Sequence, residues 1–292
     1  MSKTLKLGLP KGSLQEKTFR IFANAGFSLS ISERSYLPSI DDPQIEPVLL
    51  RAQEMSRYVQ AGALDCGITG ADWILENDSD VIRVSELSYS KQSLKPVRWV
   101  LAVPDNSPIK SLRNLNGKRI ATELVGATKR FLRKNKIKAN VEFSWGATEV
   151  KVAVGLVDAI VELTETGRSL KANNLREIIT VCESRTQFIA NKQSYKDPFK
   201  QGKMKAIVLL LQGAIAAQTK VGLKMNLREK DLKKVVSKLP ALQKPTISCL
   251  TTKGWIALET VIDESEVRRL IPELKIAGAE GIIEYSLNKV IY

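Results

Sequence analysis

The stretch Gly155–Glu177 reads GLVDAIVELTETGRSLKANNLRE, and the interpretation of the whole chain starts from it. The run Leu156 to Leu163 is apolar apart from two acidic residues, and this pattern predicts a buried strand. Residues 164–168, TETGR, predict a short polar loop. Residues 169–173 then predict the start of a helix. Strand, loop and helix therefore follow one another directly.

A glycine-containing loop between a strand and a helix is suited to binding a phosphate. Backbone N–H groups are free at a helix start, where the helix dipole also favours an anion. Glu162 lies near the end of the strand, and its carboxylate can accept hydrogen bonds from vicinal sugar hydroxyls. We therefore expect a ribose-5-phosphate subsite, with Ser169 or Thr166 as the helix cap. The alternative is an ordinary turn with Gly167 in the left-handed conformation.

The beginning of the chain repeats this order of elements. Leu5–Pro10 predicts a strand, Lys11-Gly12-Ser13 a turn, and Leu14–Ala25 a helix, with Ser13 and Glu16 forming a capping box. A lysine in the turn makes this segment a second candidate anion site. A common strand-to-helix turn explains the same pattern.

Two further charged residues stand where a strand is expected to meet a helix. Arg51 ends the strand predicted at Val48–Arg51, and Asp72 opens the helix after the buried strand Leu64–Thr69. Proteins of the α/β class place ligand contacts at such junctions. Both residues are therefore candidate binding residues, and a solvated surface charge is the alternative for each.

Composition excludes several classes of protein. Cys66, Cys182 and Cys249 show no paired spacing, which predicts free thiols in a reducing compartment rather than a zinc site or a disulfide framework. The chain has no histidine, so a histidine-based triad or general base is excluded. No apolar run approaches the ~18 residues that a membrane span needs. The N-terminal residues lack a signal-peptide pattern, and we expect a cytoplasmic protein without a membrane partner.

The formal net charge of +14 points to an anionic partner. Nucleic acid is one such partner, and small polyanions such as nucleotides and diphosphates are another. Lys and Arg are spread along the chain, and the aromatic content of 6% is low for base stacking. We therefore expect the binding partners to be small polyanions and not nucleic acid.

Strands and helices alternate from the first strand to about residue 183, which predicts an α/β fold with mostly parallel strands. A crossover at Lys95-Pro96 suggests two lobes, lobe I at residues 1–95 and 184–220 and lobe II at residues 96–183. A long apolar helix, Pro198–Gln218, closes lobe I. Ligands bind in the cleft between such lobes, beyond the carboxyl ends of the strands.

The pattern changes at Val221. Strands are expected at 221–227, 246–250, 256–262 and 281–291, and helices at 228–239 and 265–277. This order, βαββαβ, is that of a ferredoxin-like domain. Residues 221–292 carry no set of catalytic groups, so we expect a regulatory or assembly role.

These segments together resemble the long form of the ATP phosphoribosyltransferase family, which catalyses the first step of histidine biosynthesis. The resemblance covers essentially the whole chain, and the run Asp158–Glu177 is its most specific part. The other motifs that carry it are Lys11-Gly12-Ser13-Leu14, Arg51-Ala52-Gln53, Asp65-Cys66-Gly67-Ile68-Thr69-Gly70-Ala71-Asp72, Lys118-Arg119-Ile120-Ala121-Thr122 and Gly278-Ala279-Glu280-Gly281.

The resemblance implies the reaction and its residues. The family joins N1 of ATP to C1 of 5-phosphoribosyl diphosphate (PRPP) and releases pyrophosphate, with Mg²⁺ on the diphosphate. It implies two lobes of the periplasmic-binding-protein type and the ferredoxin-like regulatory domain. It assigns Glu149 and Glu162 to the reaction centre. It assigns PRPP binding to Glu162, Thr164, Glu165, Thr166, Gly167, Arg168, Ser169 and Leu170. It assigns binding of ATP and the diphosphate to Lys11, Gly12, Arg51 and Asp72.

The sequence departs from the family pattern at two places. The residue that opens the phosphate loop is often Asp in the family and is Glu162 here. An aromatic residue common after the Ile-Ala-Thr motif is absent, and Glu123-Leu124 stand there. These changes leave the fold prediction intact and bear on the contacts to ribose and adenine.

The family also implies regulation and assembly. Its C-terminal domain binds histidine as a feedback inhibitor, and here Asn226, Thr246, Ala279 and Gly281 match positions at that pocket. The resemblance further implies a homo-oligomer, from a dimer to a hexamer. A non-catalytic solute-binding protein has the same two-lobed architecture and is the alternative function.

Overall fold

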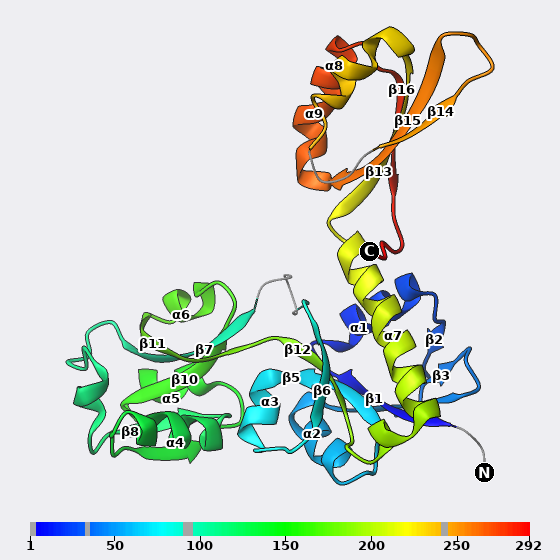
Figure 1. The fold of residues 1–292 in the computed structure, drawn as a ribbon. Helices are drawn as coiled ribbons and strands as arrows, with labels where there is room; N and C mark the ends of the chain where they lie inside the picture. Colours follow the sequence, from blue (N-terminus) through cyan, green and yellow to red (C-terminus); the bar gives the residue numbers. More distant parts are fainter. Residues whose placement is uncertain (1–3, 33–35, 90–95, 241–244) are drawn as a thin grey trace. The chain divides into compact units, whose positions relative to one another are not determined.

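The computed structural model describes residues 4–32, 36–89, 96–240 and 245–292. Contacts divide the chain into two units, Met1–Ala23 with Phe27–Val208, and Asn24–Gly26 with Leu209–Tyr292. Helix α7 (Pro198–Ala217) begins in the first unit and ends in the second (Figure 1). In the described parts of the chain, no helix is both long enough and apolar enough to cross a membrane.

One five-stranded sheet of the first unit defines lobe I. Its strand order is β4-β1-β5-β12-β6. Strand β1 lies between β4 and β5, and its Leu5, Leu7 and Leu9, which alternate onto one face of the strand, are fully buried. The strands are β1 (Leu5–Lys11), β4 (Ile45–Arg51), β5 (Cys66–Gly70), β6 (Ile82–Leu87) and β12 (Thr186–Ala190), with α1 (Gln15–Ala25), α2 (Ala52–Gln60), α3 (Ala71–Glu76) and the short pair β2 (Leu29–Ser30) and β3 (Ser39–Ile40) around them.

The other five-stranded sheet of this unit defines lobe II. Its strand order is β11-β7-β10-β8-β9, so the strand before the predicted phosphate loop, β10, is the middle one. The elements are β7 (Val97–Pro104), β8 (Arg119–Thr122), α4 (Val125–Lys134), β9 (Asn140–Phe143), α5 (Thr148–Ala153), β10 (Ala159–Thr164), α6 (Arg168–Ala172) and β11 (Leu175–Ser184).

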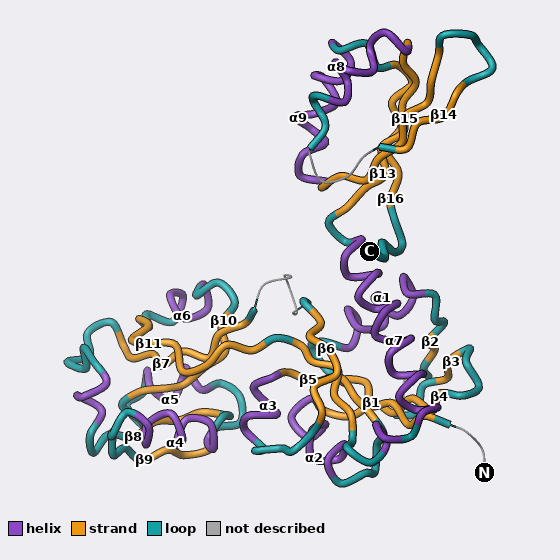
Figure 2. The backbone as a smooth tube through the Cα atoms, viewed as in Figure 1, coloured by secondary structure: helices purple, strands orange, loops and turns teal. Residues whose placement is uncertain are grey.

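The expectation of mostly parallel strands is wrong, because both sheets are mixed. β1 pairs in parallel with β4 and β5, and β8 with β9 and β10. β12 is antiparallel to β5 and β6, and β7 to β10 and β11. A parallel pair needs a long crossover, usually a helix. β11 instead ends one residue before β12 begins, with Arg185 between them, and β12 pairs antiparallel with both of its neighbours. Figure 2 shows the strands of both lobes in orange.

Helices α3 and α4 connect lobe I to lobe II. The Glu76 carboxylate accepts hydrogen bonds from the backbone N–H groups of Gly126, at 2.9 Å, and Ala127, at 2.8 Å. These N–H groups lie in the first turn of α4 and have no partner within the helix. Arg130 of α4 donates in return to the backbone carbonyl of Leu75. This contact fixes one side of the cleft.

The second unit is the ferredoxin-like domain that the sequence predicts. β13 (Lys220–Arg228), α8 (Leu232–Val236), β14 (Thr246–Cys249), β15 (Trp255–Asp263), α9 (Glu264–Ile276) and β16 (Glu280–Ser286) follow the βαββαβ order. The spatial order is β14-β15-β13-β16. The buried cluster between sheet and helices includes Leu223, Met225, Leu258 and Leu270.

Two boundaries in this unit differ from the expectation. The helix expected at 228–239 is shorter, because Arg228 still pairs with Trp255 in the sheet and a 3₁₀ turn, Glu229–Asp231, precedes α8. The strand expected to reach residue 291 ends at Ser286, where its partner strand β13 begins.

The loop after β10 also corrects the sequence prediction. The residue before α6 is Gly167, with φ 74° and ψ 0°, and it carries no side-chain cap. Ser169 and Thr166 are therefore not the helix cap. The side-chain oxygen of Thr164, the last residue of β10, instead accepts a hydrogen bond from the Gly167 N–H at 2.8 Å. This bond closes the loop between β10 and α6. For the predicted crossover at Lys95-Pro96, Lys95 lies outside the described residues.

Candidate functional site

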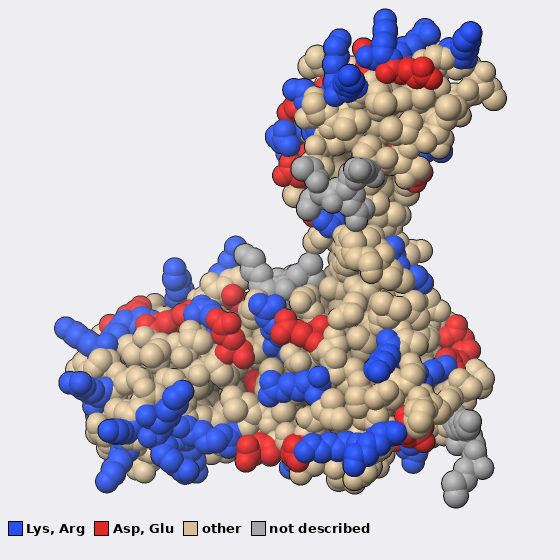
Figure 3. Space-filling view, viewed as in Figure 1, with Lys and Arg blue, Asp and Glu red and all other residues tan. Residues whose placement is uncertain are grey.

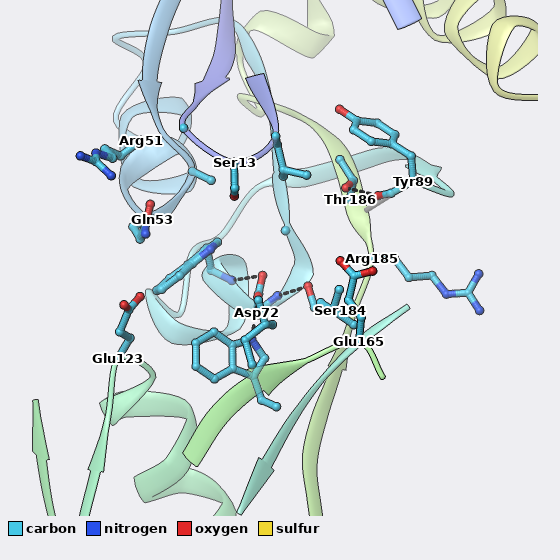
Figure 4. Close-up of a pocket in the computed structure, with 18 of the residues that line it drawn as sticks. Ser13, Arg51, Gln53, Asp72, Tyr89, Glu123, Glu165, Ser184, Arg185 and Thr186 are labelled. Atoms are coloured by element: carbon cyan, nitrogen blue, oxygen red, sulfur yellow. Dashed lines mark hydrogen bonds between the residues drawn. The ribbon is translucent and has the colours of Figure 1, made fainter. Parts of the chain in front are cut away.

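A cavity of about 290 Å³ is lined by residues from lobe I, lobe II and the strands that connect them (Figure 4). Its size is at the lower end of ordinary ligand pockets. The lining includes eight charged or polar side chains on which the rest of this section depends, namely Lys11, Arg51, Gln53, Asp72, Glu123, Glu162, Glu165 and Ser184.

The cationic part of the cavity comes from two neighbouring strand ends of lobe I. Lys11 and Arg51 are partners in the parallel register of β1 and β4, so they lie side by side where both strands end. Gly12 follows at φ +100°, and a Cβ there would meet nothing within 4 Å. The Lys11 ammonium also lies 3.5 Å from the centre of the Tyr36 ring. The structure therefore brings together Lys11, Gly12 and Arg51 on one wall.

Asp72 lies at the meeting point of the two lobes and is only 5% exposed. One carboxylate oxygen accepts a hydrogen bond from the indole N–H of Trp99 at 2.7 Å, and the other from the Trp73 backbone N–H at 3.0 Å. Its own backbone N–H donates to Ser184 Oγ (Figure 4). Burial raises the pKa of the Asp72 carboxyl, although the hydrogen bonds oppose the shift. Asp72 thus joins α3 to β7 and β11 at the edge of the cavity.

Glu162 faces the cavity from β10, and the pKa of its carboxyl is raised. Burial raises the pKa of its carboxyl to about 6, and the charges of Glu149 and Glu123 add to this increase. Hydrogen bonds from the Leu163 N–H and the Thr148 hydroxyl favour the ionised form but do not outweigh burial. The charge of Glu149, on α5, therefore acts on Glu162.

The predicted phosphate loop continues from the cavity toward the surface. Glu165 lines the cavity, whereas Thr166, Arg168 and Ser169 are exposed. Gly167 is held at a positive φ by the bond to Thr164. Leu170 packs in a buried apolar cluster of lobe II, so its side chain faces the core and not the loop.

Glu123 is a site residue that the sequence reasoning did not select. It follows β8 and lines the cavity, and burial raises the pKa of its carboxyl. Hydrogen bonds from the Gly146 backbone and the Gln53 side chain, and the charge of Arg51, oppose that shift. In Figure 4 Glu123 lies below Arg51 and Gln53, on the side of the cavity away from Thr186. Its position after a strand was the signal that pointed to Arg51, and the same rule identifies Glu123.

Four further lining residues had no signal in the sequence. Tyr89, Ser184, Arg185 and Thr186 belong to segments that pass between the lobes or follow an edge strand. Thr186 Oγ1 donates to the Tyr89 carbonyl at 2.7 Å, and the Tyr89 hydroxyl lies 2.8 Å from Thr18 Oγ1. These contacts fix the wall opposite Glu123.

The four residues matched to histidine binding do not meet within this chain. Asn226 and Gly281 are neighbours, because Asn226 on β13 pairs with Glu280 on β16. Ala279 is fully buried in the domain core. Thr246 lies on β14, at the opposite edge of the sheet from β16, and is exposed. A pocket that uses Thr246 together with Gly281 therefore needs a second chain.

The described residues form no metal cage, and Figure 3 shows how charged side chains are distributed on one face of the molecule. Among the described residues, no group of three or more His, Cys, Asp or Glu side chains is placed to hold a metal ion. Lys and Arg side chains occur on both units in the face shown in Figure 3, interspersed with acidic and other residues.

The three cysteines are free thiols, and burial raises the pKa of Cys66 and Cys182.

Comparisons with known proteins identify relatives of this chain. Residues 51–213 match the family described as ATP phosphoribosyltransferase, and residues 217–289 match the family described as the HisG C-terminal domain. The ATP phosphoribosyltransferase of Chlorobium luteolum is 59% identical over 290 residues, which cover 99% of this chain and 98% of that protein. The Thermodesulfovibrio yellowstonii protein of the same name is 59% identical over 289 residues, 99% of each chain.

A solved structure shows the same fold at lower identity. A chain of the ATP phosphoribosyl transferase (HisG:HisZ) complex from Thermotoga maritima superposes with a TM-score of 0.62 and 28% identity, covering 72% of this chain and 99% of that one. These matches do not favour the solute-binding alternative. The chain belongs to the ATP phosphoribosyltransferase family, which carries out the first step of histidine biosynthesis.

Proposed function

We propose that this cavity is where the chain transfers the phosphoribosyl group of PRPP to N1 of ATP and releases pyrophosphate. The observation that carries the proposal is one cavity with two adjacent cations, Lys11 and Arg51, at one end and the half-buried carboxylate of Glu162 in lobe II. Two polyphosphate substrates need the cations, and a cationic transition state needs the carboxylate.

The carboxylates suit the chemistry at C1 of the ribose. Displacement at an anomeric carbon passes through an oxocarbenium-like state, so positive charge develops on the sugar. A carboxylate in a partly dry cavity stabilises that charge more strongly than one in water. We assign this role to Glu162 and Glu149, and the positioning of both substrates supplies a further part of the rate. The mechanism needs no covalent nucleophile.

The loop after β10 is the proposed 5-phosphate site. Gly167 at positive φ keeps side-chain atoms away from the loop, and the exposed Thr166, Arg168 and Ser169 supply N–H, hydroxyl and guanidinium donors. Glu165 lies between this loop and the cavity. Lys11, Gly12 and Arg51 are the proposed contacts for ATP and the diphosphate, whereas Asp72 is already bonded to Trp99 and acts through the lobe junction.

Mg²⁺ is the proposed cofactor, although the described residues do not form a site for it. Mg²⁺ keeps most of its water and often binds proteins through substrate phosphates. We therefore expect it to enter bound to the PRPP diphosphate, and no step of the mechanism is assigned to it.

A direct assay tests the proposed reaction. Pyrophosphate release is expected when the chain is mixed with ATP, PRPP and Mg²⁺, and not when either substrate is omitted. A solute-binding protein would bind ATP or PRPP without releasing pyrophosphate, and that result would refute the proposal.

Domain roles and assembly follow from the family. We propose the bounds 1–95 with 184–220 and 96–183 for the catalytic lobes, and 221–292 for the regulatory domain. The Thermotoga maritima relative is a complex, and the separation of Thr246 from Gly281 in one chain supports a homo-oligomer in which two chains complete the histidine site. We place the enzyme in the cytoplasm, where ATP is available, and the free thiols fit that compartment.

Histidine is expected to inhibit the full-length chain without competing with PRPP, because the two sites lie on different domains. The coupling should be on the order of 1–3 kcal/mol. Initial rates at several PRPP concentrations, with and without millimolar histidine, measure it. A chain that ends at Gln218 lacks β13 and the rest of the domain, and should keep its activity in histidine. Inhibition of the shortened chain, or none in the full-length one, would remove the regulatory assignment.

A further inference from the structure

We propose that Glu123 recognises the exocyclic amine of the adenine ring and stabilises the positive charge that the ring acquires during the transfer. This inference rests on the proposed function of the cavity and assigns one of its carboxylates to the nucleotide base.

Glu123 is held with its carboxylate toward the cavity. It follows the four-residue strand β8, and Leu124 behind it is fully buried in the core of lobe II. The Gly146 backbone N–H and the Gln53 side chain donate hydrogen bonds to it. Gln53 belongs to α2 of lobe I and Gly146 to the segment before α5 of lobe II, so partners from both lobes hold the carboxylate.

The position of Glu123 relative to Glu162 identifies the edge of the base that it faces. The carboxylates of Glu123 and Glu162 line the same cavity, from the ends of the neighbouring strands β8 and β10. Glu162 is assigned to the sugar carbon, and N1 of adenine must approach that carbon. The exocyclic amine is bonded to the ring carbon next to N1. A base can direct N1 at the sugar in two orientations, and the one that brings its amine toward Glu123 gives that amine a hydrogen-bond acceptor.

An aromatic wall for the base is present in the same cavity. Trp73 lines it and is partly exposed, and the Trp99 ring packs edge-on against it with centroids 6.0 Å apart and an interplanar angle of 84°. Trp99 is anchored by its bond to Asp72. Glu123-Leu124 stand where the family commonly has an aromatic residue, and Leu124 is buried and cannot contact the base. Trp73 supplies an aromatic surface instead.

The reaction makes a carboxylate at this edge useful. The N1 lone pair forms the bond to C1 while the C1–O bond to pyrophosphate breaks, and that electron pair leaves with pyrophosphate. The base then carries a positive charge shared between N1 and the exocyclic nitrogen. The charge is lost when the exocyclic nitrogen releases a proton, which the Glu123 carboxylate is placed to accept. A hydrogen bond that strengthens as charge develops lowers the barrier.

The test compares two nucleotides and two variants of the full chain. Purine riboside triphosphate keeps N1 of ATP and lacks the exocyclic amine. Glu123→Gln is expected to lower kcat/KM for ATP by about 10²-fold and for the analogue by less than about threefold, because the lost interaction involves only the amine. Glu142→Gln is the matched control, because it makes the same change at an exposed residue of β9 in the same lobe and should alter neither value.

The outcomes separate this inference from the proposed function. If the parent chain releases no pyrophosphate from ATP and PRPP, the proposed function fails. If the parent is active and Glu123→Gln lowers kcat/KM for both nucleotides equally, Glu123 supports the fold of the cavity and does not contact the amine, and the inference is overturned. Unchanged values with both nucleotides overturn it as well.

Discussion

Glu162→Gln is expected to lower kcat by about 10²–10³-fold while ATP affinity stays within a few-fold of the parent. The amide keeps the shape of the side chain and its bond to the Leu163 N–H, but it lacks the charge that the cationic sugar needs. Glu149→Gln should also lower kcat. Steady-state kinetics and ATP titration measure the two effects, and rates within about twofold of the parent for both variants would end the electrostatic assignment.

The same substitution is expected to stabilise the fold at neutral pH. Burial raises the pKa of Glu162 from its ordinary value of 4.5 to about 6, so between these values the folded chain binds more protons than the unfolded chain. The free energy of unfolding of the parent therefore falls as pH rises through this window. Above pH 6 the free energy of unfolding of the parent is lower than below pH 4.5 by at most about 2 kcal/mol, at 1.36 kcal/mol per pKa unit.

Denaturation at two pH values checks this stability effect. Glu162→Gln should be more stable than the parent at pH 8, and the gain should disappear at pH 4. Its pH–rate profile should also lose the rise near pH 6 that ionisation of Glu162 gives the parent. Glu142→Gln, on the exposed strand β9, should show none of these changes. A variant that is less stable at pH 8 would show that the Glu162 charge is well solvated in the fold.

The strand-end rule explains how much of the site the sequence could predict. Lys11 was selected because it directly follows a predicted strand and Arg51 because it ends one, and parallel pairing of β1 with β4 then places them side by side. Such pairing depends on apolar patterns that are local in the sequence. Glu123 satisfies the same rule, but its strand has only four residues, and in the family pattern Glu123-Leu124 marks only the absence of an aromatic residue.

The other half of the site depends on contacts between distant segments. Asp72 was selected as a ligand contact, yet its carboxylate binds Trp99, which is 27 positions along the chain in another lobe. Ser184 and Thr186 reach the cavity because β11 passes directly into β12, and no periodicity in the sequence predicts that connection. The antiparallel strands of the two mixed sheets could not be predicted from the sequence for the same reason. Local patterns define elements, and the direction in which a strand enters a sheet depends on the whole chain.

Gly167→Val is expected to weaken PRPP binding by at least tenfold, about 1.4 kcal/mol or more, and to leave the chain folded. Gly167 has φ 74°, a conformation that β-branched residues rarely adopt. A Cβ there would lie 3.1 Å from an oxygen of Glu177, which is paired with Arg98. The loop would therefore have to move, and the N–H groups proposed to hold the 5-phosphate would move with it.

Backbone strain alone must be separated from loss of the phosphate site, and Gly117 provides the matched control. It has φ +76° in the same lobe, and a Cβ there would meet nothing within 4 Å. Gly117→Val should therefore lose similar stability through strain while binding PRPP normally. Titration of PRPP and thermal unfolding of both variants give the comparison. If Gly167→Val binds PRPP as well as Gly117→Val does, the loop after β10 is an ordinary turn and the 5-phosphate lies elsewhere in the cleft.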